Sequence, residues 1–192
     1  MKTRNIVLLV SLFFIAGSAA AQTRFYDQTR TFRENGFTYQ ADLMSCGFVL
    51  LYNKDAGRFT APAIQQTHRD GRGISAVDRE KYAVVEEGIF PIMNLVEQIV
   101  RNGFSATERS RLIRGERINL HLIICPDTGS IKEVHFRFRA NSGYATIPVT
   151  TYRQIELELK RQVRFTPTDF GRSLNFIFRG WSIDVRVPQL IL

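Results

Sequence analysis

The sequence predicts an α+β fold in which an antiparallel sheet packs against helices and the first part of the chain is rich in β-strands. Apolar and polar residues alternate over 118–124 and 134–138, as in strands that are buried on one face. Apolar residues recur at helical spacing over 92–100 and 149–164. The chain has 192 residues, 44% of them hydrophobic and 23% charged, which excludes a collagen-like or disordered protein.

The start of the chain is typical of a secretory signal peptide. Lys2 and Arg4 precede the apolar run Ile6–Ala16, and small residues follow it up to Ala21. The run is shorter than the roughly 20 apolar residues that a membrane-spanning helix needs. We therefore expect a signal peptide at 1–21, cleavage after Ala21 and export of the mature chain, with no later membrane-spanning segment.

The charge balance is positive without being concentrated. The net charge is +8, and removal of Lys2 and Arg4 leaves 24 basic and 18 acidic residues, a net charge of +6. The arginines are scattered, and no aromatic RNA-binding motif or dense basic arm accompanies them. Nucleic acid is therefore not expected as a partner.

The mature chain divides into a β-rich region at 22–88 and an α/β region at 89–192. In the first region, Phe37–Asn53 is rich in aromatic and β-branched residues and predicts a strand pair or one bent strand. The sequence Glu34-Asn35-Gly36 predicts a turn before it.

The rest of the first region is less regular. We expect a short strand at Arg58–Ala61 and a polar loop at Gln65–Gly73. Ser75–Glu87 is ambiguous, because Ser75 is a suitable helix cap whereas Tyr82–Val85 favours a strand.

Two helices are predicted at the start of the second region. The first has one apolar stripe, and Asn102-Gly103 supplies its C-terminal stop, after which Phe104 folds back on the last turn. Ser105 and Glu108 form a capping box that starts a second, short helix ending near Arg114. The stripe consists of Ile92, Leu95, Val96, Ile99 and Val100.

A β-hairpin follows, with its turn at Pro126–Ser130. If residue 126 pairs with residue 130, His121 lies opposite His135 on the face away from the core. The even-numbered apolar residues of both strands then face one core, namely Leu120, Leu122, Ile124, Val134, Phe136 and Phe138.

The helix at 149–164 is amphipathic. Its predicted inner face is Tyr152, Ile155, Leu159 and Val163, and its predicted outer face is Arg153, Glu156, Lys160 and Arg161.

The segment Leu174–Val187 predicts the last strand, with a change of phase. Leu174, Phe176 and Phe178 alternate on even numbers, whereas Trp181, Ile183, Val185 and Val187 alternate on odd numbers. Either a bulge at Gly180 in one strand or a two-residue turn that pairs Phe178 with Trp181 would account for the change.

Few residues in the mature chain have the spacing of a catalytic or metal site. Cys46 and Cys125 lie in strand-like segments, where they form either one disulfide or two buried free thiols. His68 lies in the polar loop near Asp70 and is a weak general-base candidate. The His121/His135 pair is a weak candidate for a divalent metal. No G-x-S-x-G motif or phosphate-binding loop occurs, and no cofactor is expected.

The second half resembles the TonB C-terminal domain family. The hairpin turn at Asp127–Ile131, the segment Arg164–Pro167 before a glycine, and a last strand with Trp181 resemble its strand–strand–helix–strand core, over 118–187. The whole chain also resembles small exported proteins, with no assigned activity, of gut-dwelling Gram-negative bacteria. That resemblance is based on Thr31–Tyr39, Leu51–Lys54 and Ile155–Pro167. TonB itself has a permanent anchor and a Pro-rich spacer that are not found here, so energy transduction is not implied.

These observations favour a non-enzymatic binding protein in the periplasm or at the cell surface. The resemblance implies that an extended peptide or an envelope protein binds along a sheet edge, and the last strand, with Trp181, Ile183 and Val185, is the candidate edge. The alternative is a small hydrolase or metal-dependent enzyme that uses His68 or the His121/His135 pair.

Overall fold

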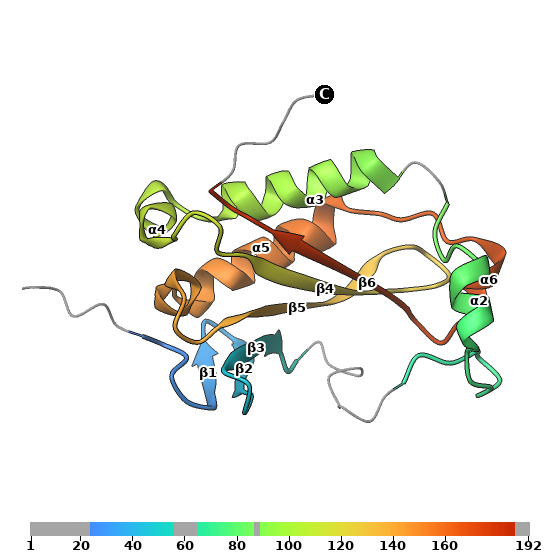
Figure 1. Cartoon of the computed structure of the whole chain (residues 1–192), viewed down its shortest axis with the longest axis horizontal. Helices are drawn as coiled ribbons and strands as arrows, with labels where there is room; N and C mark the ends of the chain where they lie inside the picture. Colours follow the sequence, from blue (N-terminus) through green and yellow to red (C-terminus); the bar gives the residue numbers. More distant parts are fainter. Residues whose placement is uncertain (1–23, 56–64, 87–88, 187–192) are drawn as a thin grey trace, which may run out of the picture.

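A computed structural model describes residues 24–55, 65–86 and 89–186, and within them the predicted α+β fold is confirmed. Six strands form one antiparallel sheet in the order β1-β2-β3-β5-β4-β6. Helices α3 (Ile89–Gly103) and α5 (Val149–Gln162) lie together on one side of it (Figure 1). None of the described helices is both long and apolar enough to cross a membrane. The signal peptide and the strand expected at Arg58–Ala61 lie outside the described residues.

The first three strands form two hairpins. β1 (Arg30–Glu34) and β2 (Phe37–Leu43) meet at Asn35-Gly36, where φ is +49° and +78°, as a tight two-residue hairpin turn requires. β3 (Phe48–Asn53) then pairs with β2, so 37–53 is a strand pair. The sequence analysis missed β1, because Phe32 is its only buried residue and the strand lacks an apolar pattern.

The first region continues into the second through the sheet, because β3 pairs with β5 (Ile131–Arg139). β5 forms the predicted hairpin with β4 (Ile118–Ile124), with a bulge beside Ile123 and Ile124. The turn depends on Gly129, whose φ is +65° and whose missing Cβ would lie 1.7 Å from the Phe165 carbonyl oxygen. The Gly129 carbonyl accepts a hydrogen bond from the Phe165 N–H, which ties the end of α5 to the hairpin.

Short helices connect these elements. Ser75 caps α2 (Ala76–Lys81), and Val85 then bridges to Pro167, so the ambiguous segment contains both a helix and an extended end. Ser105 and Glu108 form the predicted capping box of α4 (Ala106–Arg111). Two further helical turns, η1 (Gly143–Thr146) and α6 (Asp169–Arg172), lie in segments that we had not assigned to helices.

The expected bulge at Gly180 and its alternative, a turn pairing Phe178 with Trp181, were both wrong. β6 (Ile177–Ile183) is one strand in unbroken register with β4, and Trp181 lies opposite Leu120. Phe178 lies on the outer face, where its ring centroid is 5.2 Å from that of His121. Phe178 is therefore apolar without belonging to the core, and this produced the apparent change of phase.

The core lies between the sheet and helices α3 and α5. The even-numbered residues of β4 and β5 are buried as predicted, and the Phe136 ring lies 5.0 Å from the Tyr152 ring of α5. Gly103 allows α3 to approach α5, because a Cβ there would lie 2.2 Å from Ile155. Aromatic rings of both regions thus meet in one core.

We expect Phe136→Ala to lower the free energy of unfolding by about 3–5 kcal/mol, because it leaves a cavity under α5. Denaturant melts measure the loss. Phe90, at 74% exposure, is the matched control, and its replacement by Ala is expected to change stability by less than about 0.5 kcal/mol. A loss below about 1 kcal/mol at Phe136 would contradict the assigned core face.

Candidate functional site

The two candidate histidines lie on the sheet face opposite α3 and α5. His121 of β4 and His135 of β5 are directly opposite each other, as the hairpin register predicted. His135 Nε2 lies 3.1 Å from the carboxylate of Glu133, which is buried, and its ring packs 5.7 Å from that of Tyr52. His121 is partly covered by Phe178.

The environment favours neutral imidazole at His121. Burial lowers the pKa of His121, and neighbouring His135 and Arg137 lower it further. The neutral ring is the form that binds metal. However, the described residues contain no group of three or more His, Cys, Asp or Glu side chains placed to hold a metal ion.

His68 does not form a hydrolase-like triad. Its Nδ1 lies 3.2 Å from Ser173 Oγ, but that hydroxyl donates to the Phe170 carbonyl oxygen at 2.7 Å. His68 is thus the donor in the contact rather than the base that takes the proton from Ser173. Asp70, the nearby carboxylate, binds Arg72 instead. The arrangement lacks the base and orienting acid of nucleophilic catalysis.

Cys46 and Cys125 are free, so the disulfide alternative was wrong. Cys46 is exposed in the β2–β3 turn beside Phe48, which pairs with Arg139 at one end of β5. Cys125 lies in the turn at the other end of β5. The nine residues of β5 span about 26 Å from end to end, which is too far for a disulfide. The alternative of two buried thiols was also wrong, since Cys46 is exposed in a turn.

The thiol of Cys125 lines a cavity beside the β4–β5 turn. Burial would raise the pKa of Cys125, but hydrogen bonds from Thr128 and the turn backbone hold it below its usual range. The cavity, of about 510 Å³, is lined mainly by apolar atoms and also includes Ile123 and Phe176.

The sequence analysis placed Glu156 on the solvent face of α5, and this was wrong. Its side chain is fully buried between α5 and the strands of the first region. Residue 156 lies one turn after Tyr152, so it shares the inner face of the helix. Glu156 and Lys160 have the i, i+4 spacing of an ion pair on an exposed helix face, and for this reason the sequence analysis did not recognise that Glu156 is buried.

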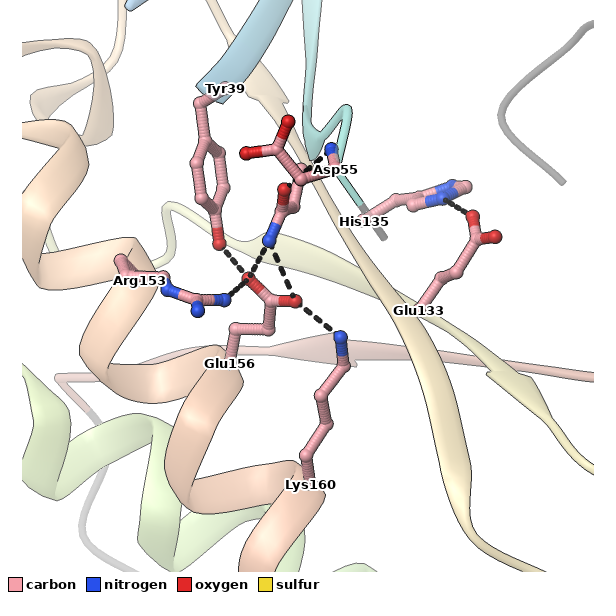
Figure 2. A network of polar contacts seen from close by, with 8 residues as sticks. Tyr39, Asp55, Glu133, His135, Arg153, Glu156 and Lys160 are labelled. Atoms are coloured by element: carbon pink, nitrogen blue, oxygen red, sulfur yellow. Dashed lines mark hydrogen bonds and ion pairs between the residues drawn. The ribbon is translucent and has the colours of Figure 1, made fainter. Parts of the chain in front are cut away.

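Four polar side chains surround the Glu156 carboxylate and make one polar cluster with it (Figure 2). The Tyr39 hydroxyl and Arg153 donate to Oε2, with Arg153 Nη1 at 3.0 Å. Lys160 Nζ donates to Oε1 at 2.5 Å, and Asn53 Nδ2 lies 3.4 Å from both oxygens. The polar residues at two core-facing strand positions, Tyr39 and Asn53, are the sequence feature that could have indicated a buried charge, and the sequence analysis did not use it.

The cluster keeps Glu156 ionised. Burial alone would raise the pKa of Glu156, but Lys160, Tyr39 and Arg153 together hold it below its ordinary value. Burial and the neighbouring carboxylate raise the pKa of Tyr39, so its hydroxyl remains a donor. With two cations for one carboxylate, the arrangement is that of a structural ion pair rather than a general acid or base.

The predicted binding residues of the last strand point inward. Ile183 and Val185 are buried, and the Trp181 ring stacks on Phe165 with centroids 6.0 Å apart. β6 itself lies at the edge of the sheet, since it pairs only with β4 among the described strands.

The register shows which backbone groups of β6 point toward β4 and which point away from it. The Ala140 N–H donates to the Gly47 carbonyl, so the N–H and C=O groups of even-numbered residues of β5 point toward β3, and those of odd-numbered residues point toward β4. In β4, the backbone groups of odd-numbered residues therefore point toward β5 and those of even-numbered residues toward β6. Even-numbered residues of β4 lie opposite odd-numbered residues of β6, so the backbone groups of the latter point toward β4. The N–H and C=O groups of Phe178, Gly180 and Ser182 therefore point away from the sheet.

Two of the even-numbered carbonyls near this edge accept side-chain hydrogen bonds. Gln66 Nε2 donates to Phe176 O at 2.8 Å, and Arg117 Nη2 donates to Ser182 O at 2.8 Å. Between them, within the described part of the chain, no strand covers Phe178 or Gly180.

Comparison with known proteins identifies a family. The family model described as DUF5043, a domain of unknown function, matches residues 22–181. The chain is also similar to a DUF5043 family protein from Bacteroides uniformis ATCC 8492, known from a crystal structure at 1.85 Å resolution. The two are 30% identical over 84% of this chain and 94% of that one, with a TM-score of 0.73. No curated protein matches the chain.

We expect Glu156→Gln to lower the free energy of unfolding at pH 7 by about 3 kcal/mol, because two cations lose a buried partner. Because the pKa of Glu156 is depressed by folding, its contribution is full above about pH 4.3, its unfolded pKa, and is lost as the pH falls further. Denaturant melts from pH 7 to pH 3 measure this. Glu158→Gln is the control and should lose much less, because Glu158 lies two residues further along α5, on its exposed side. Equal losses at the two positions would contradict the role of the cluster.

We expect Zn²⁺ and Ni²⁺ to leave the melting temperature of the mature protein unchanged, because Glu133 already engages His135 and Phe178 covers His121. Thermal scans with and without each ion test this. A rise that His121→Ala abolishes would show that the pair binds metal.

Proposed function

Because this chain belongs to the DUF5043 family, whose domain has no assigned function, we propose from its geometry that it is a non-enzymatic binding protein. It receives an extended peptide along the free edge of β6. The proposal includes export, with the ligand being a segment of an envelope protein in the periplasm or at the cell surface. One observation carries it, namely the outward backbone groups of Phe178 and Gly180.

The edge of β6 offers free hydrogen-bonding groups to an added strand. A peptide paired with β6 would form main-chain hydrogen bonds with the groups that point away from β4. At Gly180, a Cβ would meet nothing closer than 3.6 Å, so alanine fits there without a steric clash. Phe178, at 43% exposure, offers an apolar contact to the partner on the outer face.

The other face of this edge favours an acidic partner. Arg179 points to the helix side beside Trp181, and its Nε is buried without a hydrogen-bond partner among the described residues. Burial lowers the pKa of Arg179, but an arginine remains charged in proteins. A carboxylate from the added strand would supply the acceptor that Arg179 lacks.

The order of elements supports the same proposal. β4, β5, α5 and β6 follow each other in the strand–strand–helix–strand order that the TonB resemblance implies, and β4 lies between the two other strands. That likeness concerns the arrangement of the chain alone. It supports edge binding as a mode and leaves the partner to experiment.

Gly180 is the residue of this edge at which proline tests binding without disturbing the core. Ile183 and Val185 are buried, so proline at either site would disturb the core as well as the edge. Gly180 is exposed, and its N–H points outward, so proline there removes an edge donor and no bond to β4.

We expect Gly180→Pro to weaken peptide binding at least tenfold, while Gly180→Ala, which keeps the N–H, binds within about twofold of the native protein. The probe is a set of peptides selected on the mature protein from a displayed random library, and affinities are measured by calorimetry. Melting temperatures establish that both variants fold. Binding that is unchanged in a folded Gly180→Pro variant, or a library that yields no peptide, would contradict the proposal.

A further inference from the structure

We infer that an arginine pocket at one end of the outer sheet face binds a small, polar dianion. The arginine pocket is a cavity of about 560 Å³ formed by Arg114, Arg117 and Arg139, with Phe48, Asn119, Ser142 and Ser182 completing its wall. Ser182 of β6 is part of its wall, but Phe178 and Gly180, whose backbone groups carry the proposed function, are not, and the inference does not depend on that function.

The sheet register forces the arginines together. Asn119 lies opposite Arg137, and continuing this antiparallel register by two residues brings Arg117 beside Arg139 on the same face. Like charges directly opposite each other destabilise a strand pair. Arg139 is also paired with Phe48 of β3, so the pocket spans several strands of the sheet.

The arginines have no carboxylate partner within 4 Å in the described structure. Arg117 donates to a backbone carbonyl, and Arg139 lies over the Phe48 ring, 5.0 Å from its centroid. Glu116 also lines the pocket, but its carboxylate accepts the N–H groups of Ile113 and Gly143, each at 3.1 Å. Three guanidinium groups and one carboxylate leave an excess of two positive charges.

A fourth arginine, Arg137, does not line the pocket but contacts one of its wall residues. Its guanidinium lies over the Phe48 ring, 4.6 Å from the centroid, and its Nε is buried without a hydrogen-bond partner in the described residues. Guanidinium groups bind carboxylate and phosphate oxygens through paired hydrogen bonds. The pocket thus combines excess positive charge with guanidinium groups that bind no carboxylate in the described structure.

The wall of the pocket indicates the rest of the ligand. A cavity of this size exceeds one oxyanion and falls in the range of small-molecule sites. Asn119, Ser142 and Ser182 present amide and hydroxyl groups, and Phe48 is the aromatic surface. This chemistry fits a hydroxylated molecule that carries a phosphate or two carboxylates, rather than an apolar anion.

Calorimetry at low ionic strength, with glucose 6-phosphate and tartrate as probes and glucose as the neutral control, tests the site in the mature protein. We expect saturable binding of at least one anion and none of glucose. Binding of the sugar phosphate alone assigns a phosphate ligand, and binding of tartrate alone assigns a dicarboxylate. Added NaCl weakens either. The absence of saturable binding of both anions would overturn the inference.

Arg139→Gln and Arg114→Gln are each expected to raise the dissociation constant at least tenfold. Arg33→Gln is the matched control, since it removes the same charge from β1 at the opposite edge of the sheet. It should change the constant less than twofold. Because all three side chains are exposed, unchanged melting temperatures are expected. An equal loss in the control would show nonspecific attraction to a basic protein and would refute the site.

Discussion

The burial of one ionised carboxylate determines how the two parts of the chain fit together. Glu156 of α5 is ionised only because Tyr39 of β2 and Asn53 of β3 approach it from the sheet while Lys160 and Arg153 approach it from the helix. An ion in the interior requires its partners in place, since desolvation is costly without them. The cluster therefore sets the position of α5 over the first hairpins, and the aromatic core forms around that position.

The strands and helices of the second region were largely predictable because their periodicity reports burial on one face. The β4–β5 register, with His121 opposite His135, followed from the turn and the alternation alone. β1 was not predictable, because an edge strand with one buried residue has no pattern. Glu156 and Phe178 were wrongly placed for a different reason. Prediction from sequence patterns assumes that charged residues are exposed and apolar residues are buried, but Glu156 is buried and Phe178 is exposed.

The candidate sites were harder to predict than the fold, because they depend on which groups lack partners. The histidines were visible in the sequence, but their contacts with Glu133 and Phe178 were not. Trp181, Ile183 and Val185 drew attention to the last strand, but the groups that point away from the sheet there belong to the backbone of Phe178, Gly180 and Ser182. The arginine pocket draws residues from distant segments, so only the folded register assembles it.

The two edges of the sheet are unequal, and this sets a limit on self-assembly. β1 carries Arg30, Arg33 and Glu34 among its five residues, and such charge discourages strand addition. β6 presents Phe178, Gly180 and Ser182 outward. A molecule with two receptive edges propagates into a fibre, whereas a molecule with one closes after a single pairing about a two-fold axis. If copies of this chain paired through β6, that pairing would therefore end at a dimer, because the charged β1 edge would discourage the addition of a further strand.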